Sequence, residues 1–470
     1  MIKQFQFEYL WTDILLYLVV VLLSVVFMVS LRKLNVRRAW RSVFQRPLAM
    51  ASFLIVISFL GVALLDSIHY HKILPQQINH HIHYSPKTYS LLDDILAPIG
   101  ERHEKTYSAP FSLNLFAKEF ITDSKGITHN VYPRLSYADM SISDQIHAKR
   151  IVFGVLIGLI KGSLIWLTAM ILIFTIAGKF HLANVKSLYR NLFLSKSIIA
   201  WKTLFLMLLI ILLISNIALT LATDNYIFGT DKVGQDVFYL AVKSIRTGIV
   251  IGTITTMSML PFALLLGIAA GYFGGIVDAV IQYIYTTISS IPGVLLITAA
   301  ILSMQIFITT HPQFFNSLAQ VADARLLALC VILGFTSWTS LCRLLRAETL
   351  KIRESDYIQA AKALGSSTET IIFRHIIPNV MHIILITTVL DFSFLVLAEA
   401  LLSYVGVGVS PTTISWGNMI NSARLELARE PVVWWPMLAA FSFMFVLVLS
   451  GNIFADAVRD AFDPRAKITE

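Results

Sequence analysis

Residues 356–365 of this chain have the sequence DYIQAAKALG, and the sequence IIPN follows at 376–379. Tyr357, Ala360, Ala361 and Leu364 are spaced i, i+3, i+4 and i+7, so they share one face of a helix. Two of these four residues are alanines, which let the backbone of another protein approach closely. The stretch therefore predicts a short amphipathic helix that offers one face to a soluble partner.

The residues after this helix predict a turn and a second helix. Gly365 stands at the position of a C-cap glycine. Ser366 and Glu369 fit the S-x-x-E capping box, which begins a new helix, and Pro378 predicts the next break. We expect helix, tight turn and helix, placed between two long apolar helices on one side of a membrane.

The composition excludes a soluble protein. Of the 470 residues, 56% are apolar and only 14% are charged. Apolar runs of about 20 residues are long enough to cross a bilayer. We expect nine membrane spans, at about 14–31, 48–67, 151–177, 203–222, 248–271, 277–308, 326–345, 380–404 and 436–456.

The basic residues of the loops predict the orientation. The first set of loops holds twenty Lys and Arg residues, and the other set holds seven. The first set is 32–47, 178–202, 343–375 and 459–470, and the second is 1–13, 223–246, 309–325 and 406–435. Because basic loops stay in the cytoplasm, the N-terminus is predicted outside and the C-terminus inside. The net charge of +9 then reflects topology, and no nucleic-acid partner is expected.

Further motifs surround the 356–365 stretch. They are TDKVGQD at 230–236, AGYFGG at 270–275, RLLRAE at 343–348, RHIIPN at 374–379, EALLSYVG at 399–406, SWGNM at 415–419 and RDAFDPR at 459–465. In this order, over about 225–470, they resemble the EAA loop and flanking motifs of ATP-binding cassette importer permeases. The resemblance is closest to the C-type subunit of the dipeptide, oligopeptide and nickel transport family, a binding-protein-dependent transport system inner membrane component. Gln359 replaces the usual Glu of that loop, and Tyr283 and Thr286 replace the usual Arg and Asp.

The resemblance implies an all-α polytopic membrane protein in the bacterial cytoplasmic (inner) membrane. A six-helix type I importer core would carry three extra helices and a small extracytoplasmic mixed domain. We expect four parts: 1–70, with an extra helix and the first core-type helix; 71–150, outside the cytoplasm; 151–222, an inserted helix pair; and 223–470, the permease core with an EAA-like coupling loop at about 351–378.

The resemblance also implies a function and partners. The chain would form half of a translocation pathway for di- or oligopeptides, with a second permease subunit (a heterodimer), two cytoplasmic ATP-binding subunits, an extracytoplasmic substrate-binding protein and the lipid bilayer. The coupling contact would consist of Tyr357, Gln359, Ala360, Ala361, Leu364 and Gly365. The alternatives are a nickel or other small-solute importer, and a membrane enzyme or assembly factor acting through 71–150.

No catalytic motif supports the enzyme alternative. The sequence has neither a Walker A glycine loop nor a G-x-S-x-G nucleophile elbow. We therefore expect no enzyme activity and no bound cofactor, with ATP used by partner subunits.

Two sets of polar residues have open roles. Lys161, Asp391 and Glu399 lie inside apolar runs, where a charge needs a partner or a cavity; they either pair within the bundle or line the pathway. His80, His81 and His83 are close in sequence, but no Cys accompanies them and their spacing fits no tetrahedral metal signature. We expect polar surface there and no metal site; metal binding and pH sensing are the alternatives.

Overall fold

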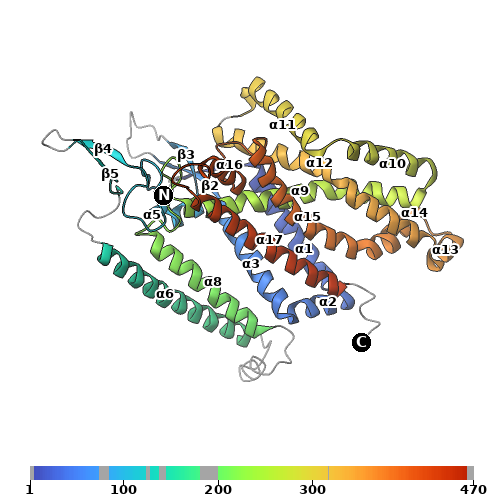
Figure 1. Ribbon diagram of the computed structural model, residues 1–470. Coiled ribbons are helices and arrows are strands. Elements are labelled where there is room, and N and C mark those ends of the chain that lie inside the picture. Colours follow the sequence, from blue (N-terminus) through green and yellow to red (C-terminus); the bar gives the residue numbers. More distant parts are fainter. Residues whose placement is uncertain are drawn as a thin grey trace. The chain divides into compact units, whose positions relative to one another are not determined.

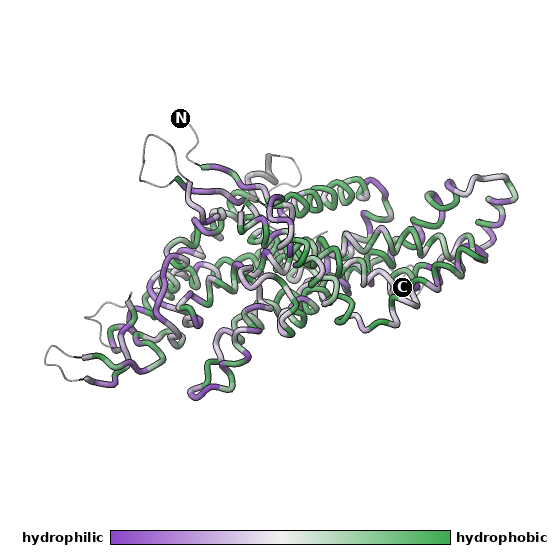
Figure 2. The backbone as a smooth tube through the Cα atoms, turned by 90° about the horizontal axis from the view of Figure 1, so that it is seen from above, coloured by the Kyte–Doolittle hydropathy of each residue, from purple (hydrophilic) through white to green (hydrophobic). Residues whose placement is uncertain are grey.

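The computed structural model describes residues 5–73, 84–122, 128–136, 144–179, 200–315 and 317–462. This described part is mostly helical, with two small antiparallel sheets, as predicted. Nine of its helices are long and apolar enough to cross a membrane, which confirms the predicted number (Figure 2). They are Trp11–Ser30, Pro47–Asp66, Gln145–Leu172, Trp201–Ala222, Val237–Phe273, Gly293–Thr310, Leu318–Arg353, Thr368–Val405 and Trp435–Phe462.

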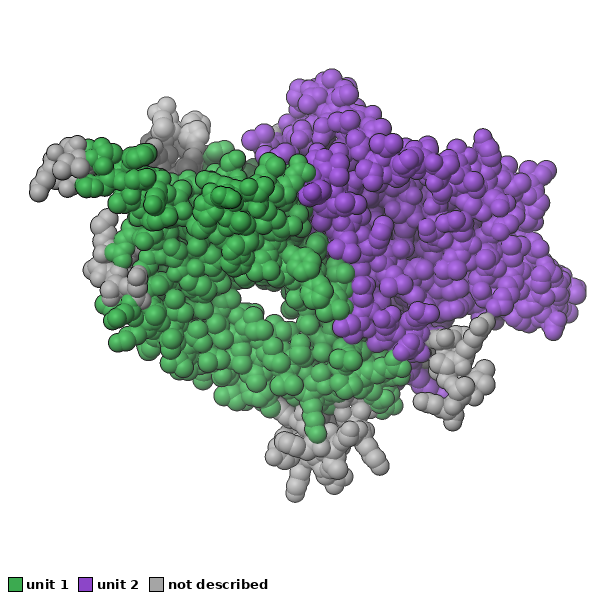
Figure 3. All heavy atoms as spheres, in the orientation of Figure 1, with its two compact units in different colours: residues 1–7, 41–246, 414–450 green, residues 8–40, 247–413, 451–470 purple. Residues whose placement is uncertain are grey.

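The chain forms two compact units, which Figure 3 shows in different colours. The first consists of residues 1–7, 41–246 and 414–450, and the second of residues 8–40, 247–413 and 451–470. Each unit thus combines segments that are far apart in the sequence. The coupling segment, which we define as residues 356–376, belongs to the second unit.

The first unit contains most of the strands and a pair of long helices (Figure 1). Strand β1 (Phe5–Glu8) has residues in both units. The complete elements of the first unit are α3 (Pro47–Asp66), β2 (His69–Ile73), β3 (Tyr84–Ser90), α4 (Leu91–Ile95), α5 (Ala97–Gly100), β4 (Glu119–Thr122), β5 (Thr128–Val131), α6 (Asp144–Lys179), α8 (Trp201–Ala222) and α16 (Trp416–Glu426). Strands β1, β2 and β3 form one sheet in that order, and β4 pairs with β5 in the other. Segment 71–150 therefore contains both strands and short helices, as expected of a mixed domain.

Helices α6 and α8 form an antiparallel pair packed through glycines. A Cβ at Gly158 would lie 2.6 Å from Cα of Ile217, and one at Gly162 would lie 3.0 Å from a methyl carbon of Leu213. Small residues at this spacing let two membrane helices approach closely. The Trp166 indole N–H also donates to the carbonyl of Phe205, at 3.0 Å.

The second unit contains most of the remaining long helices. Its elements are α1 (Trp11–Ser30), α10 (Gly275–Ser290), α11 (Gly293–Thr310), η1 (Pro312–Phe314), α12 (Leu318–Arg353), α13 (Asp356–Ala363), α14 (Thr368–Ile371), η2 (Ile372–Ile376) and α15 (Ile377–Val405). Helices α2 (Leu34–Gln45), α9 (Val237–Phe273) and α17 (Trp435–Phe462) have residues in both units.

The expected span 277–308 is wrong as a single helix. It is divided into α10 and α11, because Ile291 and Pro292 adopt extended backbone angles and Pro292 cannot continue the hydrogen-bond ladder of α10. Helix α11 alone is long enough to count among the nine candidate spans.

Candidate functional site

The coupling segment begins where α12 ends, and a glycine terminates its first helix. Helix α13 covers Asp356–Ala363, and Gly365 follows it with φ of 79°. The Ser366 N–H donates to the backbone carbonyl of Ala361, and the Gly365 N–H donates to the backbone carbonyl of Lys362, each at 3.0 Å. These two bonds form a Schellman motif, so the predicted left-handed cap at Gly365 is confirmed.

The predicted capping box at Ser366 is wrong by one residue. Helix α14 is capped by Ser367, whose hydroxyl accepts from the backbone N–H of Thr370 at 3.3 Å. The Ser366 N–H closes the turn after α13, so it is not free for the bond to Glu369 that a capping box at Ser366 requires. The Thr370 hydroxyl also lies 2.8 Å from the Ser367 hydroxyl.

The predicted break at Pro378 is also wrong. Residues 368–405 form one continuous apolar helix. A π-helical turn, η2, precedes Pro378, which lies in the first turn of α15. Proline is tolerated there because the π-helical turn already interrupts the α-helical hydrogen-bond ladder just before it.

Helix α13 has one buried face and one exposed face. Ile358 is fully buried, whereas Tyr357 and Leu364 are 46% and 86% exposed. Ala360 is exposed, and Ala361 is half-buried against the hydrophobic cluster beneath the helix. The four residues on the predicted shared face are therefore not equivalent, and Ala361 lies at its inner edge.

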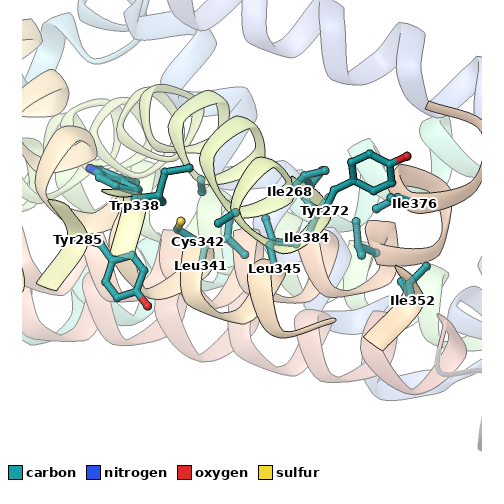
Figure 4. Packing of buried hydrophobic residues seen from close by; sticks show 14 of the residues in the cluster. Ile268, Tyr272, Tyr285, Trp338, Leu341, Cys342, Leu345, Ile352, Ile376 and Ile384 are labelled. Atoms are coloured by element: carbon teal, nitrogen blue, oxygen red, sulfur yellow. The ribbon is translucent and has the colours of Figure 1, made fainter. Parts of the chain in front are cut away.

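The cluster beneath α13 holds the coupling segment against α9 and α12. Ile358, Ile371 and Ile376 join buried residues of those helices. Figure 4 shows Ile376 with Tyr272 and Leu345, which belong to the same cluster. Cooperative burial of this kind makes the position of a short helix independent of its own weak helical propensity. Buried packing therefore holds the segment against the long helices.

Close helix packing supports this cluster. A Cβ at Gly267 would lie 2.9 Å from the carbonyl oxygen of Cys342, and one at Gly271 would lie 2.6 Å from Cβ of Thr349. Arg346 forms a bidentate ion pair with Asp278 of α10, at 2.5 and 2.6 Å. Gly267 and Gly271 thus allow α9 to pack closely against α12.

Polar contacts fix two of the predicted coupling residues. The Tyr357 hydroxyl accepts from the Asn379 amide at 3.0 Å, and the Tyr357 and His375 rings lie 6.2 Å apart. The Gln359 amide donates to the carbonyl of Arg353 at 3.2 Å. A glutamate could not donate this bond, so the contact accounts for an amide at position 359. Sequence reasoning found neither contact, because each depends on how the chain turns between helices.

The intramembrane polar residues lie in different settings. Glu399 of α15 is buried and accepts from the Ser403 hydroxyl at 2.7 Å, which favours a structural role. Asp391, on the same helix, is half-buried. Lys161 is exposed on α6. Lys161 is ten residues, about 15 Å along a helix, from the start of the expected span 151–177.

The proposed histidine group cannot be placed. His80, His81 and His83 lie outside the described residues. Within the described ranges, no group of three or more His, Cys, Asp or Glu residues could hold a metal ion. His71 lies in the first sheet, where its Nδ1 is 2.8 Å from the carbonyl of Ser85.

The 230–236 motif is covered by residues 104–108 of the same chain. The buried Thr230 hydroxyl accepts from the Ser108 N–H at 2.6 Å and donates to the carbonyl of Thr106 at 2.8 Å. The Trp435 indole donates to the Thr230 carbonyl at 2.9 Å. Gly234 has φ of 79°, and a Cβ there would lie 1.8 Å from the carbonyl oxygen of Glu104. No sequence pattern predicts this contact, because the residues that form it are more than 100 positions apart.

Asp236 ends this motif and caps α9. Its Oδ1 accepts from the backbone N–H groups of Phe238 and Tyr239, at 2.7 and 3.3 Å. Its Oδ2 is buried and has no hydrogen-bond partner among the described residues. Burial raises the pKa of Asp236 to about 7, despite the two N–H donors.

Comparison with known proteins identifies the family. Residues 263–468 match the model of the binding-protein-dependent transport system inner membrane component. The chain is 31% identical over 243 residues to a dipeptide transport system permease of Lactococcus lactis. The aligned region covers 52% of this chain and 65% of that protein. It is 32% identical over 240 residues to a dipeptide permease of Alkalihalophilus pseudofirmus, covering 51% and 72%. It is 27% identical over 245 residues to the oligopeptide permease of Bacillus subtilis, covering 52% and 73%. The chain therefore belongs to the binding-protein-dependent transport system inner membrane components, as a multi-pass permease subunit that is not itself an enzyme.

Proposed function

We propose that this chain is one of two different permease subunits of an ATP-driven importer of di- or oligopeptides. Its coupling segment would contact one of two cytoplasmic ATP-binding subunits, and an extracytoplasmic binding protein would deliver the substrate. Three relatives are described as dipeptide or oligopeptide permeases, which supports the peptide class. No described feature of the structure favours nickel as substrate.

The observation that supports the coupling role is the division of α13 into two faces. Ile358 anchors the helix in the cluster, while Ala360, Leu364 and the turn at Gly365 face outward. Small exposed residues allow a partner's backbone to approach, and Leu364 at 86% exposure offers an apolar anchor. A short, rigidly held helix of this kind would transmit a push from an ATPase to α12 and α15.

The mechanism follows from this rigidity. Closure of the ATP-binding subunits would move α13, and the cluster around Ile358 would carry the movement into the long helices. Rigid-body rocking of helix bundles is the general basis of alternating access. The chain would contribute half of the pathway and no catalytic group.

Enlarging Ala360 tests the coupling contact. We expect Ala360→Trp to abolish peptide-stimulated ATP hydrolysis by the purified complex, because the indole would fill the space that the partner's backbone needs. Ala360→Ser is the matched control, since it keeps the residue small, and it should hydrolyse ATP as the natural protein does. Full stimulation by Ala360→Trp would exclude α13 as the coupling helix.

Two further measurements test the substrate and the topology. In a deletion strain, the restored gene should restore uptake of labelled peptides and leave Ni²⁺ uptake unchanged; the reverse result would favour the nickel alternative. Single cysteines at Thr128, which is exposed on β5, and at Thr469 should react with impermeant reagent from opposite sides of the membrane. Reaction of both from one side would overturn the orientation with the N-terminus outside.

A further inference from the structure

A small hollow in the second unit is lined by α11, α12 and the segment after α15. Its polar lining consists of Gln305, Arg325 and Ser410, from these three parts respectively. Ile301, Met304 and Ala328 supply apolar surface next to them. The enclosed part of the hollow is small, about 10 Å³, which is room for roughly one water molecule. It therefore admits only a small polar group, such as the end of a carboxylate, while the rest of a ligand would lie outside it.

Arg325 supplies the hollow with a charge that the described chain leaves uncompensated. Its Nε is buried and has no hydrogen-bond partner, and no described carboxylate pairs with its guanidinium. The nearby Asp323 is instead directed to α1, where the Thr12 N–H donates to it at 3.2 Å. By contrast, Arg346 on the same helix forms a bidentate ion pair with Asp278, which compensates its charge. A partly buried guanidinium without such a partner favours binding of an anion.

The neighbouring polar groups specify the kind of anion. The Gln305 amide carries two N–H donors, and the Ser410 hydroxyl, which lies 2.9 Å from the Thr412 hydroxyl, can also donate. No carboxylate lines the hollow. A planar carboxylate matches the guanidinium fork with two parallel hydrogen bonds, and the apolar lining would contact an adjacent hydrocarbon side chain.

The hollow also lies near the outer ends of its helices. Arg325 is seven residues after Leu318, about 10 Å from the start of α12, and Gln305 is five residues before the end of α11. Both ends lie on the side that the Lys and Arg distribution assigns to the extracytoplasm. A solute released there would meet Arg325 before crossing the membrane.

We propose that Arg325, with Gln305 and Ser410, binds the C-terminal carboxylate of the incoming peptide. This inference rests on the proposed function as a peptide importer. Arg325 is a specificity-determining residue in this scheme: it orients the terminal carboxylate, while Ile301, Met304 and Ala328 contact the last side chain.

The test compares one labelled tripeptide with its C-terminal amide, using the complete importer reconstituted in proteoliposomes. The natural protein should import the free acid in preference to the amide. Arg325→Met should lower uptake of the acid about tenfold or more, as expected for a lost charge-assisted hydrogen bond, and leave uptake of the amide unchanged. Arg325→Lys, which keeps the charge without the fork, should give an intermediate value. Arg429→Met is the control, because Arg429 is an exposed arginine paired with Glu426 and should not alter the ratio of acid to amide.

Each outcome decides one question. If Arg325→Met lowers uptake of acid and amide equally, or of neither, the carboxylate site is wrong although peptide import stands. If the natural protein imports neither compound but hydrolyses ATP with its partners, the peptide class itself is wrong. ATP hydrolysis by the Arg325→Met complex at the natural rate without peptide shows that the variant is assembled, so a loss of acid uptake is then a loss of recognition.

Discussion

The coupling segment and the 230–236 motif are both short, motif-bearing stretches next to long helices, yet they are used in opposite ways. In the coupling segment, Ala360 and Leu364 face outward above the buried Ile358. In the 230–236 motif, Thr230 is fully buried against Thr106 and Ser108, and Asp236 is 2% exposed. A family motif therefore marks a structural position, and only burial tells whether its side chains are open to a partner.

The difference predicts two kinds of mutational damage. Changes in the outward face of α13 should impair transport and leave the protein folded, because no core contact is lost. Changes in the 230–236 motif should first destabilise the first unit, because Glu104 and Ser108 pack directly against the motif. The following predictions test this contrast.

Substitutions at the coupling turn should have the largest effect on transport. Gly365→Asp places a charged side chain on the outward surface and strains a residue with φ of 79°, although a Cβ there meets no atom within 4 Å. Ala361→Trp should also abolish transport. Since Ala361 packs against the cluster, it should loosen the segment as well. Peptide uptake should fall to background for both variants, with normal membrane insertion. Residual uptake above about a tenth of normal for Gly365→Asp would contradict the proposed contact.

Gly234→Ala should be the most damaging change in the buried motif. The added Cβ would lie 1.8 Å from the Glu104 carbonyl oxygen, and φ of 79° is unfavourable for alanine. We expect low recovery of folded protein and a lower Tm in detergent. Gly365→Ala is the matched control, because it has the same φ but open space around the Cβ. Equal losses of Tm in the two variants would remove the contrast between the regions.

Thr230→Val should cost about 1–3 kcal/mol, the usual penalty for leaving buried polar groups unpaired. The hydroxyl accepts from the Ser108 N–H and donates to the Thr106 carbonyl, and valine replaces neither bond. Denaturant or thermal unfolding should show the loss. Peptide-stimulated ATP hydrolysis per folded complex should remain normal, and its specific loss would mean that the motif also acts in coupling.

Local chemistry explains which features the sequence could predict. The glycine cap at Gly365 and the nine long apolar helices depend on residues close in sequence, and both are confirmed. The capping box was misplaced because Ser366 and Ser367 can both cap a helix, and only the turn geometry selects Ser367. The cover over Thr230 and the hollow at Arg325 depend on contacts between distant segments, for which a single sequence carries no periodic signal.

Asp236 predicts a pH dependence confined to the buried motif. Burial raises its pKa to about 7, so between about pH 4 and 7 the unfolded chain releases the proton while the folded chain retains it. Stability contributed by Asp236 is therefore fully present below about pH 4 and is lost as pH rises through about 7. Asp236→Asn keeps an oxygen for the Phe238 and Tyr239 N–H groups and should flatten this part of the Tm profile. An unchanged difference in Tm between natural and variant protein across this range would contradict the assignment.

Gln359→Ala should have the smallest effect on uptake. It tests whether position 359 serves the turn after α12 or the surface that meets the ATPase. The Gln359 amide donates to the Arg353 carbonyl at 3.2 Å, an exposed bond that joins α13 to the end of α12. Because Gln359 is neutral, its removal deletes no ion pair, and an exposed hydrogen bond contributes about 1 kcal/mol or less. Uptake should stay within about threefold of normal, with ATP-binding subunits still recovered in the complex.

Gln359→Glu is the informative companion variant. It restores the residue usual in the family but cannot donate a hydrogen bond to the Arg353 carbonyl, and position 359 is next to the exposed Ala360. If Gln359→Glu impairs uptake more than Gln359→Ala, the amide serves this chain's own turn. If Gln359→Glu raises coupling above that of the natural protein, position 359 instead belongs to the surface that meets the ATPase.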